Sequence, residues 1–363
     1  MSILICGSLA FDTIMTFEGR FAEQILPSQL HILNVSFLVP GLRREYGGCA
    51  GNIAYGLRQL GSPAVPLAMV GNDAQDYLKR LQGLGVDTRF IGTTSDNYTA
   101  QAMIMTDRDN NQITAFHPGA MSDAHANVVP TDADIRLAIV SPDGRDAMLS
   151  HAEQLHAAGI PFVFDPGQGL PMFNGDELTH FIELASWVTV NDYEGQMLCD
   201  RTGLSFESIA AQVKGLIVTL GAQGCEVWEQ GSKTLVPGVT ATEVVDPTGC
   251  GDAFRAALLH GLAQGWGLAR CADLGNRIGA TKIASRGGQN YRFSSADLAA
   301  EFQKQKSPTL SRRARCHLKD DFRACWTWET ARQPEGSAWS ELQVPLGLPA
   351  SWPAQLFLLG LPF

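Results

Sequence analysis

The sequence predicts an α/β fold of three layers, in which helices cover both faces of a mainly parallel central sheet and a small β lid is attached. Short apolar runs alternate along the chain with stretches whose apolar residues recur at helical spacing. Hydrophobic residues make up 45% and charged residues 18%, as in ordinary globular proteins. With 363 residues, the chain is long enough for one large domain and a small appendage.

The predicted strands are continuous apolar runs, which is the pattern of strands buried on both faces. Helical patterns lie between them, for example at residues 51–60, 73–84 and 145–158. Because buried strands alternate with helices, we expect parallel strands joined by right-handed connections. The strands are Ile3–Gly7, Val65–Val70, Ala100–Thr106, Ile135–Ser141, Phe162–Asp165, Trp187–Asn191 and Gly215–Leu220.

Two segments depart from this alternation. Within residues 13–46, Thr13–Phe17 and Ser36–Val39 are alternating stretches, which predict either a small β flap or a loop with two edge strands. The stretch from Ser307 to the C-terminus has poor periodicity and holds four of the seven Trp. We expect this atypical tail, 307–363, to lie outside the core fold, either disordered or loosely docked through its aromatic residues.

Charge and cysteine usage exclude several classes of protein. A net charge of −10 leaves no excess of Lys and Arg to neutralise nucleic-acid phosphates. The first residues read as a buried strand rather than a signal peptide, and no apolar run is long enough to span a membrane. The eight cysteines are scattered without a C-x-x-C pair, which favours reduced thiols in a cytoplasmic protein.

The segment Asp246–Asp252 is the strongest candidate for a chemical site. A short strand enters a turn that contains glycine, and an amphipathic helix leaves it. The backbone N–H groups of Gly249, Cys250 and Gly251 would then lie at a helix N-terminus, which favours an anion. Asp252 is either a helix cap or a general base beside a bound phosphoryl group. The glycines favour the base, since a cap alone requires no anion hole.

A second glycine-rich segment precedes another predicted helix. Gly47 and Gly48 permit close approach of the backbone to a ligand, and the amide of Asn52 can both donate to and accept from sugar hydroxyls. The alternative is an ordinary glycine pair before a helix. Asp12 follows the first strand, where a lone Asp is usually a turn residue.

These segments together resemble the ribokinase-like (PfkB) carbohydrate kinases. Asp246–Asp252 is similar to the family signature Asp-Thr-x-Gly-Ala-Gly-Asp, with Pro247 and Cys250 as departures, and Gly47–Asn52 is similar to Gly-Gly-x-x-x-Asn. The resemblance covers about residues 1–300. It implies a ribokinase-like fold, with a kinase domain at 1–306 and lid segments at about 13–46 and 98–118.

The resemblance also implies an ATP- and Mg²⁺-dependent phosphotransferase. Asp252 becomes the catalytic base, and the anion hole is formed by Gly249, Cys250 and Gly251. Asp12 becomes the acceptor of hydrogen bonds from vicinal sugar hydroxyls. Further matches assign Asn191 and Glu194 to the magnesium–water–phosphate network, Thr219, Gly221 and Gly224 to ATP phosphates and ribose, and Asn276 to adenine.

Three more implications of the resemblance are weaker. Asp165–Gln168 is similar to the segment that lines the phosphate-transfer site, although Gln168 stands where many relatives carry Arg or Asn. Asp246, Thr248 and the loop 285–288 are similar to a monovalent-cation site, which would hold K⁺. The lid, near Arg20–Leu42, is the surface through which relatives often dimerise, so we expect a homodimer.

The acceptor is predicted from residues around the lid. Phe116 and Met121 either stack against a base or are strand core residues. The segment Phe116–Ala120 is similar to prokaryotic adenosine or nucleoside kinases, which favours phosphorylation of the 5′ hydroxyl of a nucleoside such as adenosine. A free sugar such as ribose is the alternative. A non-catalytic sugar- or nucleotide-binding regulator is the alternative of another class, and Asp252 argues against it.

Overall fold

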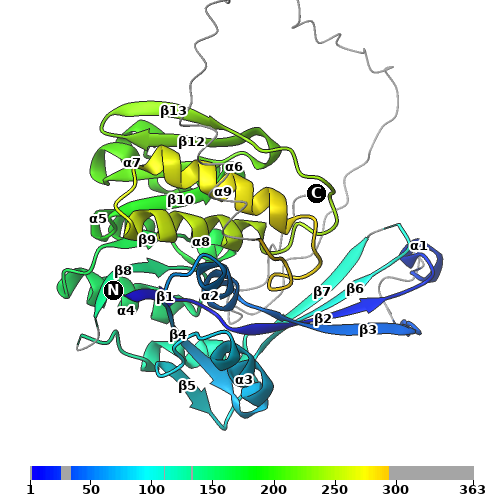
Figure 1. The fold of residues 1–363 in the computed structure, drawn as a ribbon. Coiled ribbons are helices and arrows are strands. Elements are labelled where there is room, and N and C mark those ends of the chain that lie inside the picture. Colours follow the sequence, from blue (N-terminus) through cyan, green and yellow to red (C-terminus); the bar gives the residue numbers. More distant parts are fainter. Residues whose placement is uncertain (1, 26–33, 110, 132–133, 294–363) are drawn as a thin grey trace, which may run out of the picture. The chain divides into compact units, whose positions relative to one another are not determined.

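The computed structural model describes residues 2–25, 34–109, 111–131 and 134–293. The predicted tail, 307–363, lies outside these residues. The described part of the chain contains a nine-stranded sheet and a separate four-stranded sheet (Figure 1). Among the described helices, none combines the length and the apolar character that crossing a bilayer requires.

The large sheet confirms the predicted α/β class. Its strand order is β13-β12-β11-β10-β9-β8-β1-β4-β5. The strands from β11 to β5 pair in parallel, and β12 and β13 add an antiparallel hairpin at one edge. The strands are β1 (Ser2–Cys6), β4 (Ala64–Gly71), β5 (Ile91–Thr94), β8 (Ile135–Val140), β9 (Phe162–Phe164), β10 (Trp187–Asn191), β11 (Gly215–Thr219), β12 (Gly224–Glu229) and β13 (Ser232–Pro237).

Helices cover both faces of this sheet, and alternate residues of β1 show the division. Ile3 and Ile5 pack with residues of α2, α3, α8 and α9, whereas Leu4 and Cys6 pack with residues of α4 to α7. The three predicted layers are therefore present. The helices are α1 (Phe21–Gln24), α2 (Cys49–Gln59), α3 (Gln75–Gly83), α4 (Arg145–Ala157), α5 (Gly175–Leu184), α6 (Asp192–Thr202), α7 (Phe206–Gln212), α8 (Cys250–Ala263) and α9 (Leu268–Lys282).

The small sheet is the predicted β lid, with strand order β3-β2-β6-β7. Its strands are β2 (Ala10–Thr16), β3 (Gly41–Gly47), β6 (Ala100–Thr106) and β7 (Gln112–His117). The apolar pattern grouped Ala100–Thr106 with the central strands, whereas the family resemblance placed it in the lid segment 98–118. The strand pairs with β2 in the small sheet, as the resemblance implied. One detail of the prediction was wrong. Residues 36–39 do not form a strand, and the partner of β2 within residues 34–47 is β3. β3 begins directly after Pro40, which has no N–H to donate to the ladder.

Candidate active site

The first turns of α2 and α8 lie together, and each helix begins after a glycine in the left-handed backbone region. Gly48 has a φ of 83° and Gly249 a φ of 78°. A Cβ on Gly48 would lie 2.6 Å from the backbone of Ser8 and of Ala10, so no side chain fits there. Two helix N-termini, with their positive dipole ends, therefore meet at one place.

The N–H groups at these two helix starts are not equally available to bind an anion. In α2, Cys49 and Ala50 donate to the side chain and the carbonyl of Ser8. In α8, Cys250 donates to the carbonyl of Pro247. Gly249 and Gly251 are thus left as the candidate donors of the predicted anion hole, and the side of the site that belongs to α8 is the better anion site.

Asp252 joins the two helices. The Nδ2 of Asn52 donates to Oδ2 of Asp252 over 2.7 Å, and the thiol of Cys49 lies close enough to lower the pKa of the same carboxylate. Burial raises the pKa of Asp252 to about 6, against the opposing effect of the Asn52 hydrogen bond. The side chain is therefore more basic than a free Asp and is still ionised at neutral pH, as a general base requires.

Asp12 faces Asp252 from the small sheet. Its carboxylate lies against Gly47, where a Cβ would approach Oδ2 to 2.5 Å, so the glycine is needed at this position. Burial raises the pKa of Asp12 to about 6, and the charges of Asp252, Asp246 and Glu45 add to the effect. The two carboxylates therefore lie close enough to influence each other's protonation.

Phe116 shares a face of the small sheet with Asp12. The register pairs Asp12 with Ala102 on β6, and Ala102 with Phe116 on β7. Directly paired residues point to the same face. The ring of Phe116 is 43% exposed, so it is not a core residue. Met121, in the turn Gly119–Ala126 that follows β7, is half-buried.

A buried ion pair lies beneath the start of α8. Arg255 makes two hydrogen bonds to Asp165, from Nε over 3.0 Å and from Nη2 over 2.9 Å. The same Nη2 lies 3.9 Å from Oε2 of Glu194. Its Nη1 lies 3.3 Å from where a Cβ on Gly251 would be. The pattern Asp246–Asp252 ends before Arg255, so the sequence analysis did not include this cation.

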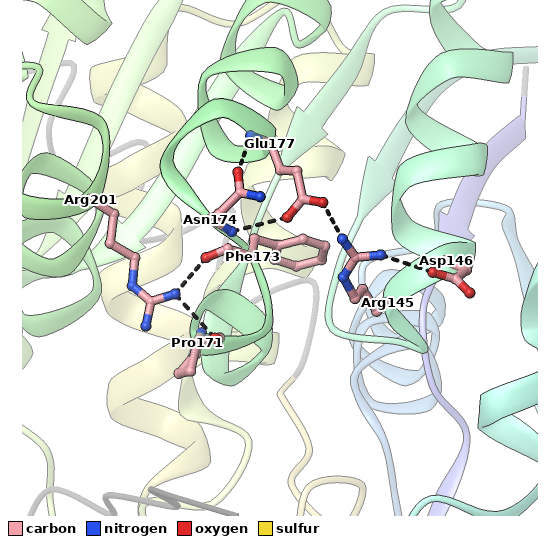
Figure 2. Close-up of polar contacts among 7 residues, drawn as sticks. All are labelled: Arg145, Asp146, Pro171, Phe173, Asn174, Glu177 and Arg201. Carbon is pink, nitrogen blue, oxygen red and sulfur yellow. Dashed lines mark hydrogen bonds and ion pairs between the residues drawn. The ribbon is translucent and has the colours of Figure 1, made fainter. Parts of the chain in front are cut away.

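The segment after Asp165 is held in place by two arginines from neighbouring helices (Figure 2). Arg201 of α6 donates to the carbonyls of Pro171 and Phe173 over 3.1 and 2.5 Å. Arg145 of α4 pairs with Glu177, which forms the capping box of α5 with Asn174. These contacts fix the chain on the far side of Asp165, while Arg255 fixes its carboxylate.

Four of the residues predicted to bind ATP or its magnesium lie in a helix capping box and in a glycine turn. Asn191 and Glu194 form a capping box at the start of α6. The capping box explains both residues without a ligand, but it does not prevent them from also contacting the phosphate network. Burial raises the pKa of Glu194. Gly221 and Gly224 both have positive φ, of 56° and 100°, in the turn after β11.

Two other predicted ATP ligands have protein partners. The hydroxyl of Thr219 donates to the carbonyl of Val190 over 3.4 Å. The Nδ2 of Asn276 donates to the carbonyls of Pro237, over 3.0 Å, and Val236, over 3.4 Å. Asn276 therefore ties α9 to β13, and its Oδ1 is the atom that remains for a ligand.

A buried network behind Asn52 was missed by the sequence analysis. The Nε2 of Gln289 donates to Oδ1 of Asn52 over 3.2 Å and to the hydroxyl of Tyr77 over 2.5 Å. The Tyr77 hydroxyl in turn donates to the carbonyl of Gly47 over 2.6 Å. Gly288 packs directly on Asn52, where a Cβ would lie 2.4 Å from Oδ1. This network sets the orientation of the amide that holds Asp252.

This fold, with an acidic residue at an anion-binding helix start and a lid that carries a second carboxylate, defines a ribokinase-like phosphotransferase. A model of the pfkB family of carbohydrate kinases matches residues 19–294. The chain therefore belongs to the pfkB family. It is an enzyme that transfers a phosphoryl group to an alcohol.

Similar proteins include several nucleoside kinases. One from Methanocaldococcus jannaschii is 29% identical over 289 residues, covering 79% of this chain and 92% of the relative. Ribokinase of Bacillus subtilis is 25% identical over 297 residues, covering 79% and 94%. The solved structure of a Burkholderia thailandensis nucleoside kinase in complex with inosine is 51% identical, covers 84% of this chain and 97% of that one, and superposes with a TM-score of 0.75.

The first prediction concerns the buried network. Tyr77→Phe removes the donor to the Gly47 carbonyl and the acceptor for Gln289 at a fully buried position, so we expect a loss of roughly 1–3 kcal/mol in the free energy of unfolding. Urea denaturation measures it. Tyr193→Phe is the control, because Tyr193 is 59% exposed. Equal stability of the two variants would show that the network contributes nothing.

The second prediction concerns Arg255. Arg255→Met leaves Asp165 and Glu194 without their cation, so we expect destabilisation of roughly 3–5 kcal/mol and a large fall in kcat. Adding Asp165→Asn removes one of the uncompensated charges and should recover much of the stability but not the activity. Thermal denaturation and steady-state kinetics measure the two effects. Full activity in the double variant would mean that the ion pair is only structural.

Proposed function

We propose that this enzyme transfers the γ-phosphoryl group of ATP to the 5′ hydroxyl of a nucleoside. The observation that carries the proposal is the placement of Asp252, at an anion-binding helix start, opposite a lid face that carries both Asp12 and Phe116. A carboxylate suits ribose hydroxyls, and an exposed aromatic ring suits a base. Relatives described as nucleoside kinases, one of them solved with inosine, support the same acceptor class.

In the proposed reaction, the Asp252 carboxylate accepts the proton of the attacking hydroxyl. The hydroxyl oxygen forms a bond to the γ-phosphorus, and the bond from that phosphorus to the bridging oxygen breaks to release ADP. The N–H groups of Gly249 and Gly251 stabilise charge on the transferring group, an effect of about 2.7–4 kcal/mol per donor in other enzymes. Arg255, beneath Gly251, adds positive potential at the same point.

On the acceptor side, Asp12 receives hydrogen bonds from the ribose hydroxyls. Gly47 and Gly48 give the backbone room to approach the sugar, and Asn52 orients Asp252. Phe116 stacks on the base, and Met121 lines the pocket beside it. Ribose alone is the second candidate, because Asp12 serves a free sugar equally well and Bacillus subtilis ribokinase is among the relatives.

ATP is proposed to bind along the ends of β10 and β11. Thr219, Gly221 and Gly224 approach its phosphates and ribose, while Oδ1 of Asn276 accepts from the adenine amino group. Asn191 and Glu194 are proposed to orient the magnesium of ATP-Mg²⁺ through water. Among the residues the structure describes, no group of three or more His, Cys, Asp or Glu is arranged to hold a metal, so the phosphates and water would supply most ligands.

Two further expectations stay predictions. The first is dimerisation through the lid, and the second is a cytoplasmic location.

The thiols of Cys49 and Cys250, at the start of α2 and α8, are free, and burial raises the pKa of both, that of Cys250 to about 11. These cysteines are therefore poor nucleophiles, and the proposed reaction does not require a cysteine nucleophile.

The third prediction tests the base. Asp252→Asn removes proton transfer, so we expect kcat to fall by roughly 10²–10⁴-fold. In the wild type, kcat/KM should decline as the pH falls through about 6, where Asp252 and Asp12 become protonated.

The stability of the Asp252→Asn variant serves as its control. Because the folded-state pKa of Asp252 is raised, the ionised carboxylate destabilises the fold above that pKa. The neutral amide should therefore melt at the same temperature or a higher one at pH 7.5. A variant that retained full kcat would rule out Asp252 as the base.

The fourth prediction tests the acceptor. An ADP-release assay with inosine, adenosine, cytidine, ribose and fructose 6-phosphate should show the highest kcat/KM for a nucleoside. Phe116→Ala should raise the KM for the nucleoside about tenfold or more, if the ring contributes a typical base–aromatic stacking energy.

Met103→Ala is the matched control, because Met103 is similarly exposed, at 42%, but its paired partner Thr13 places it on the opposite face of the lid. A preference for ribose would establish the sugar-kinase alternative. If none of these acceptors supported turnover, both the nucleoside and the ribose proposals would be wrong.

A further inference from the structure

Lys282, the last residue of α9, is completely buried, with 0% of its surface exposed. Its Nζ donates to the backbone carbonyl of Asp246 over 2.7 Å and to that of Ser285 over 3.1 Å. A buried lysine is costly unless hydrogen bonds and opposite charges compensate it. This cation therefore has a specific place in the structure, between the loop that leads to Asp252 and the loop after α9.

Polar and acidic groups around Lys282 compensate part of the cost of burying its ammonium group. Carbonyl groups at the C-terminal end of a helix carry the negative end of its dipole. The N–H groups of Val245 and Asp246 donate to the carbonyl of Ile283, which brings this segment against the end of α9. Burial lowers the pKa of Lys282, while the Cys250 thiol and the carboxylates of Asp246 and Asp252 act to raise it.

The same residues were expected to form a monovalent-cation site. A K⁺ ion in a protein replaces its hydration shell with carbonyl oxygens. Here the carbonyls of Asp246 and Ser285 already bind an ammonium group. The Asp246 carboxylate is also occupied, since it accepts from the N–H groups of Thr248 and Gly287 over 2.9 and 2.8 Å. A second cation at these carbonyls would lie within a few ångströms of the first and be repelled. The residues present do not fit K⁺.

We propose that Lys282 is a built-in cation that takes the place of a monovalent metal ion in this enzyme and positions the anion-binding loop. The enzyme would then be active without K⁺. Lys282 is a positioning residue, since it acts through the backbone of Asp246 and Ser285.

The positioning effect has a short path to the reacting groups. Asp246 begins the turn that ends at Gly249, and its carboxylate holds Gly287. The next residue, Gly288, packs on both Gly249 and Asn52. Lys282 therefore connects the two loops whose contact sets the positions of the Gly249 N–H and of the amide that binds Asp252. The kinetic part of this inference rests on the proposed kinase activity, whereas the structural part does not.

The fifth prediction tests Lys282 in two ways. When K⁺ is replaced by tetramethylammonium at constant ionic strength, the kcat/KM of the wild type should change by less than about two-fold. The melting temperature of the wild type should not change. Lys282→Ala removes the cation, so its kcat should fall about tenfold or more. Its melting temperature should fall too, and K⁺ or methylammonium should raise that temperature more than tetramethylammonium does.

Lys79→Ala removes a lysine whose side chain is 72% exposed, so it should change neither property. A wild type that loses more than about tenfold in activity without K⁺, or that melts higher with it, would overturn the proposal. So would a Lys282→Ala variant as active and stable as the wild type. The wild-type melting experiment needs no acceptor and no variant, so it gives its answer even if the nucleoside proposal fails or Lys282→Ala does not fold.

Discussion

The hydrogen bond from Asn52 to Asp252 is the contact around which the site is assembled. It joins residues 200 positions apart and brings together the first turns of two helices. It forms only because glycines stand at 48, 249 and 288, where side chains would collide or require a strained backbone. Cys49 on one side and Gln289 on the other complete the surroundings. The large sheet, by placing α2 and α8 on one face, makes this contact available.

The role proposed for Asp252, a base beside an anion site, carries an electrostatic problem, because an incoming phosphate would raise its pKa further. The structure offsets this with two buried cations. Arg255 acts to lower the pKa of Asp252, against the larger opposing effect of its partner Asp165, and Lys282 lies close enough to interact with the same carboxylate. Each cation is held by its own partners, Arg255 by Asp165 and Lys282 by carbonyls. Positive charge is therefore present without a side chain that competes for the proton.

The sequence predicted the parts of the site whose signals are local. Asp246–Asp252 and Gly47–Asn52 combine glycines and a functional residue within a few positions, so their chemistry is visible without the fold. Arg255, Gln289 and Lys282 were missed because their partners lie 90, 237 and 36 residues away, and alone they resemble ordinary helix or loop residues. The large sheet was predicted because each buried strand shows its own apolar pattern. The apolar pattern did not separate Ala100–Thr106 from the central strands, because periodicity does not identify the partner of a strand. Only the family resemblance placed this strand in the lid.

The two sheets carry different parts of the candidate site, and the small sheet is connected to α2 through Gly48. The small sheet carries Asp12 and Phe116, and the large sheet positions the groups proposed to take part in phosphoryl transfer. β3 ends at Gly47 and α2 begins at Cys49, so a single residue, Gly48, separates the lid from the helix that holds Asn52. Tyr77 holds the Gly47 carbonyl at this junction. A displacement of the lid strand at Gly47 would therefore move the start of α2, and the position of an acceptor on the lid would then be linked to the amide that orients Asp252.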